Sequence, residues 1–148
     1  MKRSSYDEPD LQRHGSVLLA EDDDDLRMLI AETLRAEGFT VIEAPNGVAL
    51  VETLVSWLEA GEPPLDLVVS DVRMPGVSGL SVLEGVSDWD ELRGLPMLLI
   101  TAFPEPRLHE FARRFGAVSL LEKPFEMTAL VRVVRGAIDG YDPDPARG

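Results

Sequence analysis

The sequence predicts an α/β fold in which one five-stranded parallel sheet is doubly wound and flanked by five helices. Short apolar runs alternate five times with segments whose apolar residues recur at helical spacing. Four of the five runs are almost continuously apolar, which is typical of parallel strands buried on both faces. The chain has 148 residues, of which 45% are hydrophobic, so it can bury the core of one domain. A repeated strand-then-helix order implies right-handed crossovers and helices on both faces of the sheet.

The expected strands span residues 17–20, 40–44, 67–70, 97–100 and 118–121. Helical patterns follow them at about 26–34, 48–58, 78–86, 108–115 and 127–138. We expect the strand order 2-1-3-4-5, which places the second strand at an edge. Residues 15–138 are expected to form the domain. Residues 1–14 are expected to be a flexible leader, and residues 139–148, rich in turn formers, a flexible tail.

The composition excludes several classes of function. The 27 acidic and 14 basic residues give a net charge of -13, which disfavours direct binding to nucleic acid or to an anionic membrane surface. The chain has no Cys, so a disulfide framework, a thiolate metal site and a Cys nucleophile are excluded. No apolar run approaches the ~20 residues that span a bilayer, and no signal-peptide core is present. We therefore expect a cytoplasmic protein.

Residues with reactive side chains follow four of the five expected strands. Glu21 and Asp22 follow the first, Asp71 the third, Thr101 the fourth and Lys123 the fifth. Ligands of doubly wound sheets bind at the carboxyl ends of the strands, so these side chains are expected to converge. Three converging carboxylates repel one another unless a cation lies among them, and oxygen ligands suit Mg²⁺ or Mn²⁺. Neither His lies near the cluster, which argues against Zn²⁺.

A metal site, a central carboxylate, a hydroxyl and a lysine together indicate phosphoryl transfer. Asp71 can act as the nucleophile and form an acyl phosphate. Lys123 can place a point charge on the phosphate, and the Thr101 hydroxyl can donate to it. Lys123 is one of two lysines against 12 arginines, so a lysine here is more informative than usual.

Five consecutive acids, from Glu21 to Asp25, follow the first expected strand. Such runs are usually solvated surface. Glu21 and Asp22 are close enough to the strand to be functional. Asp24 or Asp25 is expected to cap the first helix, and Asp23 is expected to lie on the surface.

These motifs together resemble the receiver domain of two-component response regulators, which has a CheY-like, flavodoxin-like fold. The resemblance covers about residues 17–138. It lies in the segments Val17-Leu18-Leu19-Ala20-Glu21-Asp22, Asp71-Val72-Arg73-Met74-Pro75-Gly76 with Ser78-Gly79-Leu80, Thr101-Ala102 and Lys123-Pro124-Phe125. Each segment alone is a weak signal, but their occurrence in this order at strand ends is specific.

The resemblance implies a role for each site residue. Asp71 would be the phosphoacceptor, and Mg²⁺ would bind to Glu21, Asp22, Asp71 and the backbone carbonyl of Arg73, with Asp22 the more direct ligand of the acidic pair. Thr101 and the backbone amide of Ala102 would bind the phosphoryl group. Lys123 would pair with Asp71 or its phosphate, and the bond before Pro124 would be cis.

The implied function is that of a signalling switch rather than an enzyme acting on a separate substrate. A sensor histidine kinase or a histidine phosphotransfer protein would supply the phosphoryl group. A downstream protein target would receive the signal, since no DNA-binding segment follows and a stand-alone receiver is expected. A homodimer could form through the helix at 108–115, the strand at 118–121 and the helix at 127–138.

Two features concern how such a switch would be tuned. Most receivers carry Tyr or Phe three residues before the lysine, where this chain has Leu120, so coupling through an aromatic rotamer is excluded there. Arg73 and Phe103 each lie two residues beyond a site residue and could reach over the phosphorylation site. We hypothesise that both affect autodephosphorylation.

Two other functions would share part of this pattern. A receiver-like scaffold could bind partners without being phosphorylated, and Leu120 is the feature that favours it. A phosphatase of the haloacid-dehalogenase type also uses an Asp nucleophile at a strand end. That class carries a second Asp two residues later, where this chain has Arg73.

Overall fold

A computed structural model describes residues 15–60, 64–92 and 94–140. The expected leader at 1–14 and all but the first two residues of the expected tail lie outside this range. The described elements are β2 (Ser16–Ala20), α2 (Asp24–Ala36), β3 (Thr40–Ala44), α3 (Gly47–Ala60), β4 (Leu67–Asp71), α4 (Gly79–Asp88), the short 3₁₀ helix η1 (Asp90–Leu92), β5 (Met97–Thr101), α5 (Pro106–Arg114), β6 (Ser119–Glu122) and α6 (Met127–Asp139).

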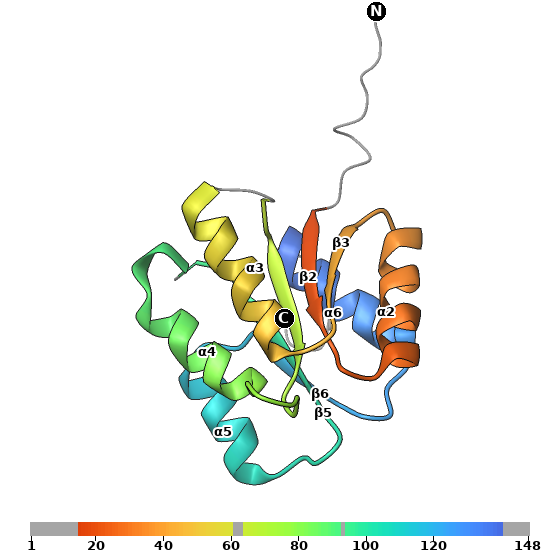
Figure 1. Ribbon diagram of the computed structural model, residues 1–148. Coiled ribbons are helices and arrows are strands. Elements are labelled where there is room, and N and C mark those ends of the chain that lie inside the picture. The colour runs from red at the N-terminus through yellow and green to blue at the C-terminus, as the bar shows by residue number, and fades with distance from the viewer. Residues whose placement is uncertain (1–14, 61–63, 93, 141–148) are drawn as a thin grey trace, which may run out of the picture.

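The strands form one parallel sheet in the order β3-β2-β4-β5-β6 (Figure 1). This is the order predicted from the sequence. The inner strands β2, β4 and β5 are buried along their whole length, whereas the edge strands β3 and β6 are partly exposed. The central position of β4 between β2 and β5 brings the carboxyl ends of these three strands together.

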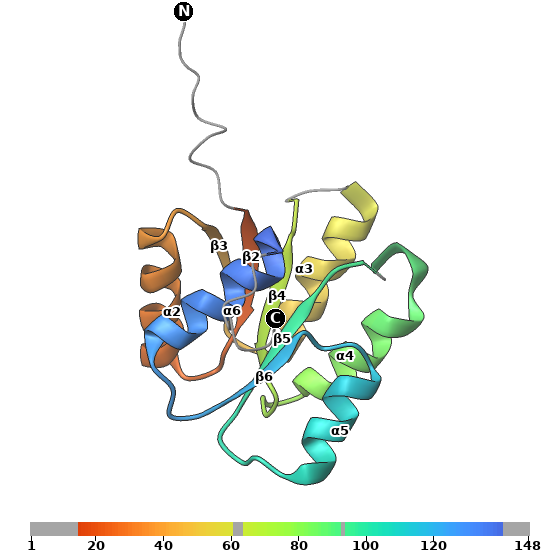
Figure 2. The ribbon, with the colours of Figure 1, turned by 180° about the vertical axis from the view of Figure 1, so that it is seen from behind.

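Helices cover both faces of the sheet, and each face has its own apolar core. Alternate residues of β2 show the division, because Leu18 packs with α3, α4 and α5 while Val17 and Leu19 pack with α2 and α6. Figure 1 shows α3 and α4 in front of the sheet, and Figure 2 shows α2 and α6 on the opposite side. No helix in the described part of the chain is long and apolar enough to cross a membrane.

The structure corrects the predicted start of the first helix. Asp23 is the N-cap, with extended φ and ψ angles, and its side chain accepts a hydrogen bond from the backbone N–H of Leu26. Asp24 and Asp25 lie in the first turn instead, where their negative charges interact favourably with the helix dipole. The last strand is also displaced by one residue, since β6 begins at Ser119 and the side chain of Val118 is exposed.

Candidate functional site

The ammonium group of Lys123 bridges two carboxylates at the ends of neighbouring strands. Its Nζ lies 2.7 Å from Oδ2 of Asp71 and 3.1 Å from Oε1 of Glu21. Both carboxylates are buried, and the Lys123 side chain is 23% exposed, so water screens these interactions little. Burial lowers the pKa of Lys123, but the hydrogen bond and charge of Asp71, together with those of Glu21, outweigh that effect and raise it. Lys123 is therefore held in its charged form.

Glu21 is fully buried immediately after β2. Burial is the main cause that raises the pKa of its carboxyl to about 7, and the negative charge of Asp71 adds to the effect. Two hydrogen-bonding groups act in the opposite direction, namely the backbone N–H of Asp23, which donates to Oε2 at 3.0 Å, and Lys123. A divalent cation bound here would offset the free-energy cost of burying this carboxylate beside that of Asp71.

The three predicted metal ligands do lie together. One carboxylate oxygen from each of Glu21, Asp22 and Asp71 can be chosen so that all lie within 4.8 Å of one another. Oε1 of Glu21 is buried, and the ammonium of Lys123 lies 3.1 Å from it. Asp22 is exposed, so the cluster is open to solvent on one side. Hard oxygen donors with open coordination positions fit Mg²⁺ or Mn²⁺.

Asp71 is the last residue of the central strand, and the chain after it folds back over its carboxylate. Oδ1 accepts a hydrogen bond of 3.0 Å from the backbone N–H of Arg73, so both carboxylate oxygens have a donor. The N-terminus of α4 approaches from the side, because Gly79 donates to the carbonyl of Val72 at 2.9 Å. A Cβ at Gly79 would lie 2.4 Å from the carbonyl oxygen of Asp71, so this close approach requires glycine.

Thr101 is the last residue of β5 and is 1% exposed. Its hydroxyl accepts a hydrogen bond of 3.0 Å from the backbone N–H of Phe103, which leaves the hydroxyl proton free to be donated. The backbone N–H of Lys123 donates to the carbonyl of Thr101 at 2.7 Å. This bond joins the ends of β5 and β6, and the Lys123–Pro124 peptide bond that follows is cis, as the resemblance implies.

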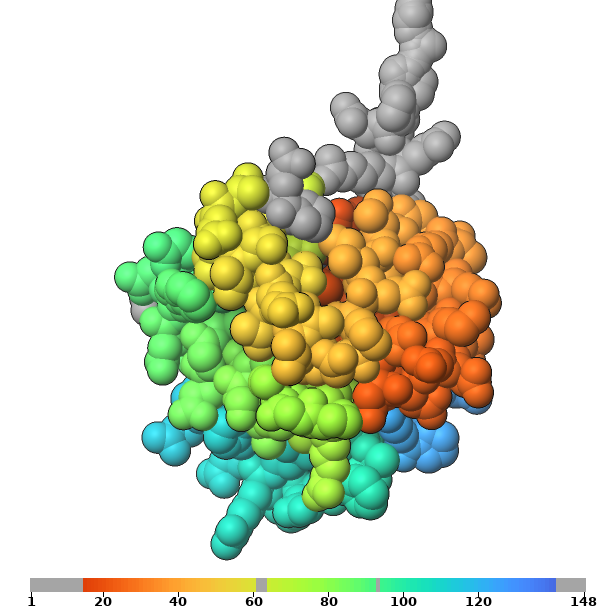
Figure 3. Space-filling model, viewed as in Figure 1, coloured from red at the N-terminus to blue at the C-terminus, as the bar shows by residue number. Residues whose placement is uncertain are grey.

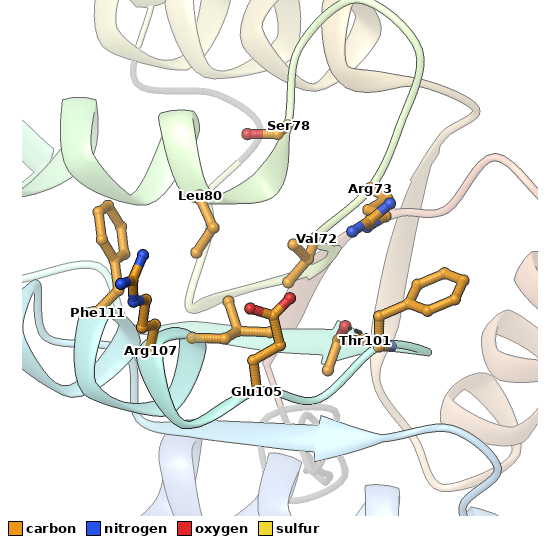
Figure 4. Close-up of a pocket in the computed structure, with 10 residues that line it drawn as sticks. Val72, Arg73, Ser78, Leu80, Thr101, Glu105, Arg107 and Phe111 are labelled. Atoms are coloured by element: carbon orange, nitrogen blue, oxygen red, sulfur yellow. Dashed lines mark hydrogen bonds between the residues drawn. The ribbon is translucent and has the colours of Figure 1, made fainter.

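A pocket of about 360 Å³ lies between the loop after β4 and the loop after β5 (Figure 4). Arg73, Thr101 and Phe103 line it, together with Glu105 at the N-cap of α5 and Arg107 on α5. The guanidinium carbon of Arg73 lies 4.6 Å from the centre of the Phe103 ring. The two residues expected to affect dephosphorylation are thus in contact with each other.

Arg27 on α2, which no sequence pattern singled out, contacts the backbone of the acidic pair. Its Nη1 donates to the backbone carbonyl of Glu21 at 2.8 Å, and the same guanidinium pairs with Asp24 at 2.7 Å and with Glu43 at 3.3 Å. Only 14% of the side chain is exposed. Arg27 therefore fixes the backbone that carries the acidic pair. Its position on the first helix, one turn after the cap, is the only sequence signal that could have indicated this.

Leu120 lies on the edge strand β6 and is partly buried against the core that α3, α4 and α5 cover. It also lines a surface groove beside α5, together with His109 and Arg113. His109 pairs with Glu122 at 2.9 Å across that surface. Position 120 therefore presents no aromatic side chain on this face.

Comparison with known proteins agrees with the geometry. A family model described as the response regulator receiver domain matches residues 17–135. The transcriptional regulatory protein PdtaR of Mycobacterium tuberculosis is 36% identical over 126 residues, which are 84% of this chain and 57% of PdtaR. The polar-differentiation response regulator DivK of Brucella anthropi is 29% identical over 120 residues, which are 81% of this chain and 93% of DivK.

Among solved structures, the chemotaxis protein CheY4 of Vibrio cholerae superposes with a TM-score of 0.71 at 26% identity. The match covers 83% of this chain and 98% of CheY4. The chain spans 57% of the length of PdtaR and 26% of that of the regulator NtrC from Escherichia coli, so it corresponds to only a part of these relatives.

Proposed function

Because the chain belongs to the response regulator receiver domain family, we propose that it accepts a phosphoryl group on Asp71 from a histidine kinase or a histidine phosphotransfer protein. Receiver domains act as signalling switches within two-component systems. One observation carries the proposal for this chain. The carboxylate of Asp71, at the end of the central strand, lies 2.7 Å from the ammonium of Lys123 and within one cluster with Glu21 and Asp22.

The acidic cluster would hold the metal ion. Glu21, Asp22 and Asp71 supply carboxylate oxygens, and the resemblance adds the backbone carbonyl of Arg73. When bound, Mg²⁺ or Mn²⁺ supplies positive charge that offsets the charge of the attacking carboxylate and of the phosphoryl oxygens. The close approach of the three carboxylates supports this role, because the ammonium of Lys123, which contacts Asp71 and Glu21, supplies one positive charge to a cluster of three acids.

The transfer step uses the carboxylate of Asp71 as nucleophile. An oxygen of Asp71 attacks the phosphorus of a phosphohistidine, the P–O bond forms as the P–N bond breaks, and the imidazole leaves with the electron pair of that bond and takes up a proton from solvent. Lys123 keeps its ammonium beside the new acyl phosphate. The Thr101 hydroxyl, whose proton is free, and the backbone amide of Ala102 are the proposed donors to the phosphoryl oxygens.

The signal would leave through contacts with other proteins. A net charge of -13 supports a protein target over nucleic acid or an anionic membrane. We also propose that two copies of the chain can form a homodimer through α5, β6 and α6. Arg113, which lines the groove beside α5, is a basic residue of that face.

Incubation with acetyl phosphate and Mg²⁺, followed by intact-mass measurement, tests the proposal. The wild-type chain is expected to gain one phosphoryl group, and the gain should disappear when EDTA replaces Mg²⁺ or when Asp71→Asn is used. A folded wild-type chain that gains no mass would instead favour the scaffold that binds partners without phosphorylation. The haloacid-dehalogenase alternative is disfavoured because Arg73, at the position of that family's second Asp, contacts Phe103.

A further inference from the structure

An apolar groove of about 160 Å³ runs between α3 and α4, away from the acidic cluster. Figure 1 shows the two helices in front of the sheet, and Figure 3 shows their yellow and green surfaces next to each other on the same face of the molecule. Val51 and Val55 of α3 form one wall, and Val82 and Val86 of α4 the other, with Trp89 at the end of α4. None of these residues takes part in the proposed phosphoryl transfer.

Three apolar side chains of the groove are open to solvent, whereas Val82 and Val86 of the α4 wall are buried. Trp89 is 48% exposed, and Val51 and Val55 are each 37% exposed. Gly85 lines the groove on α4, and a Cβ built there would meet no atom within 4 Å. The α4 backbone therefore leaves free space in which a side chain of another molecule can insert.

The groove has a negatively charged rim. By helical spacing, Glu52 and Glu59 on α3 are surface neighbours of Val55, Glu84 on α4 is a neighbour of the groove residue Ser81, and Asp88 is a neighbour of Gly85. All four acids are exposed, and none forms an ion pair with another residue in the described ranges. The sequences of α3 and α4 contain no Lys and no Arg. A partner that covers the apolar centre would therefore meet these four acids and no basic side chain of α3 or α4.

We propose that this groove docks an amphipathic helix of a partner protein whose apolar ridge is flanked by lysine or arginine side chains. The apolar ridge would fill the space above Gly85 and pack against Trp89, and the basic flanks would face the four acids. A second copy of this chain is disfavoured as the occupant, because symmetric pairing of this face would bring the same acids toward each other. The inference rests on the proposed function only for the role that the partner would have in signalling. Docking itself needs no phosphoryl group.

A synthetic peptide helix provides the probe. It carries Leu at helical i, i+3, i+4 and i+7 positions and Lys elsewhere, and it is titrated into the isotopically labelled full chain while amide NMR shifts are followed. We expect the shifts to concentrate on α3 and α4. A scrambled peptide of the same composition, and a peptide with Glu in place of every Lys, are expected to bind at least about tenfold more weakly.

Two variants test whether the groove itself is the site. Gly85→Leu fills the free space while favouring the helix, and the pair Glu52→Lys with Glu84→Lys reverses the rim. Each is expected to weaken peptide binding about tenfold or more. The matched control reverses the exposed acids Glu32 on α2 and Glu110 on α5, which changes net charge equally and is expected to alter affinity by no more than about twofold.

Three results would overturn the proposal. Equal binding by the amphipathic and scrambled peptides, or equal weakening by the rim and control reversals, would mean that binding follows net charge alone. Concentration-dependent dimerisation that Gly85→Leu abolishes would assign the groove to a second copy. Because these measurements use the unphosphorylated chain, their failure would leave the acetyl phosphate experiment, and the function it tests, unaffected.

Discussion

The guanidinium of Arg73 stacks on the ring of Phe103, with 4.6 Å between the guanidinium carbon and the ring centre. The backbone of each residue is tied to a site side chain, since the N–H of Arg73 donates to Asp71 and the N–H of Phe103 donates to Thr101. The Phe103 side chain is otherwise exposed at 57%. The contact therefore links the two loops that follow β4 and β5, beside the proposed phosphorylation site.

This contact predicts a joint effect on the lifetime of the acyl phosphate. Arg73→Ala and Phe103→Ala are each expected to shorten it about two- to fivefold, because the stacked pair restricts the approach of water, and a cation–π contact at an exposed site is worth ~0.5–1 kcal/mol. The double variant is expected to decay no faster than the faster single variant. Loss of the phosphoryl group is followed by intact mass after removal of the donor.

Phe103→Leu with Arg73→Lys serves as a milder comparison, since it keeps an apolar bulk and a cation. Additive effects in the double alanine variant would show that the two residues act separately. Unchanged decay in both single variants would show that neither affects dephosphorylation.

Lys123 and a metal ion would both neutralise the carboxylates of Asp71 and Glu21, so they compete. Replacement of Lys123 is therefore expected to change Mg²⁺ binding and phosphorylation in opposite directions. Among the described residues, Lys123 is the one cation that contacts both carboxylates; Lys123→Met removes it, so Mg²⁺ is expected to bind about three- to tenfold more tightly. Phosphorylation by acetyl phosphate should nevertheless fall. Thermal stabilisation by Mg²⁺ measures the first effect and intact mass the second.

Arg135→Met is the control, because Arg135 forms an ion pair with Glu37 on the face covered by α2 and α6. Weaker Mg²⁺ binding by Lys123→Met would contradict the view that Lys123 opposes the cation.

Arg27 is expected to be a positioning residue for the metal site. Arg27→Met removes the bond of 2.8 Å to the carbonyl of Glu21 and should weaken Mg²⁺ binding about tenfold, as loss of supporting contacts does at other metal sites. Arg35 offers a matched control, since it also pairs with Glu43 and donates to a strand carbonyl, that of Val41. Arg35→Met should lower the melting temperature without changing Mg²⁺ affinity. Calorimetric titration distinguishes these results, and equal affinity losses in the two variants would argue against a positioning role for Arg27.

Two glycines on α4 are expected to respond oppositely to substitution. Gly79→Ala would force a Cβ to within 2.4 Å of the Asp71 carbonyl oxygen, so the loop must shift, at a cost of about 1–3 kcal/mol. Gly85→Ala meets no atom within 4 Å and should stabilise the helix by about 0.5–1 kcal/mol. Urea denaturation measures both. A stable, readily phosphorylated Gly79→Ala variant would contradict the tight packing inferred at the end of β4.

The sequence allowed the strand order and the convergence of the candidate site residues to be predicted for a simple physical reason. Parallel strands end at one edge of the sheet, so residues that follow buried apolar runs, such as Asp71 and Lys123, must lie near one another. Glu21 and Asp22 follow β2 in the same way and lie in the acidic cluster with Asp71.

Other features depended on details that sequence patterns do not contain. Five consecutive acids offer equally plausible helix caps, and only the backbone angles identify Asp23. The contact of Arg73 with Phe103 joins loops that are far apart in the sequence and depends on side-chain direction. In the sequence, Arg27 cannot be told from an ordinary basic residue on the surface of a helix. Its hydrogen bond to the carbonyl of Glu21 depends on how α2 packs against the end of β2.

Chemical trapping of the phosphoryl group tests the central claim most directly. Borohydride reduces an aspartyl phosphate to homoserine, with hydride as the reductant and phosphate as the leaving group, and peptide sequencing by mass spectrometry then locates the product. After treatment with acetyl phosphate and Mg²⁺, we predict homoserine at position 71 and at no other acidic position. Homoserine at position 22 or 25, or none in a chain that has gained a phosphoryl group, would contradict the assignment of Asp71 as the phosphoacceptor.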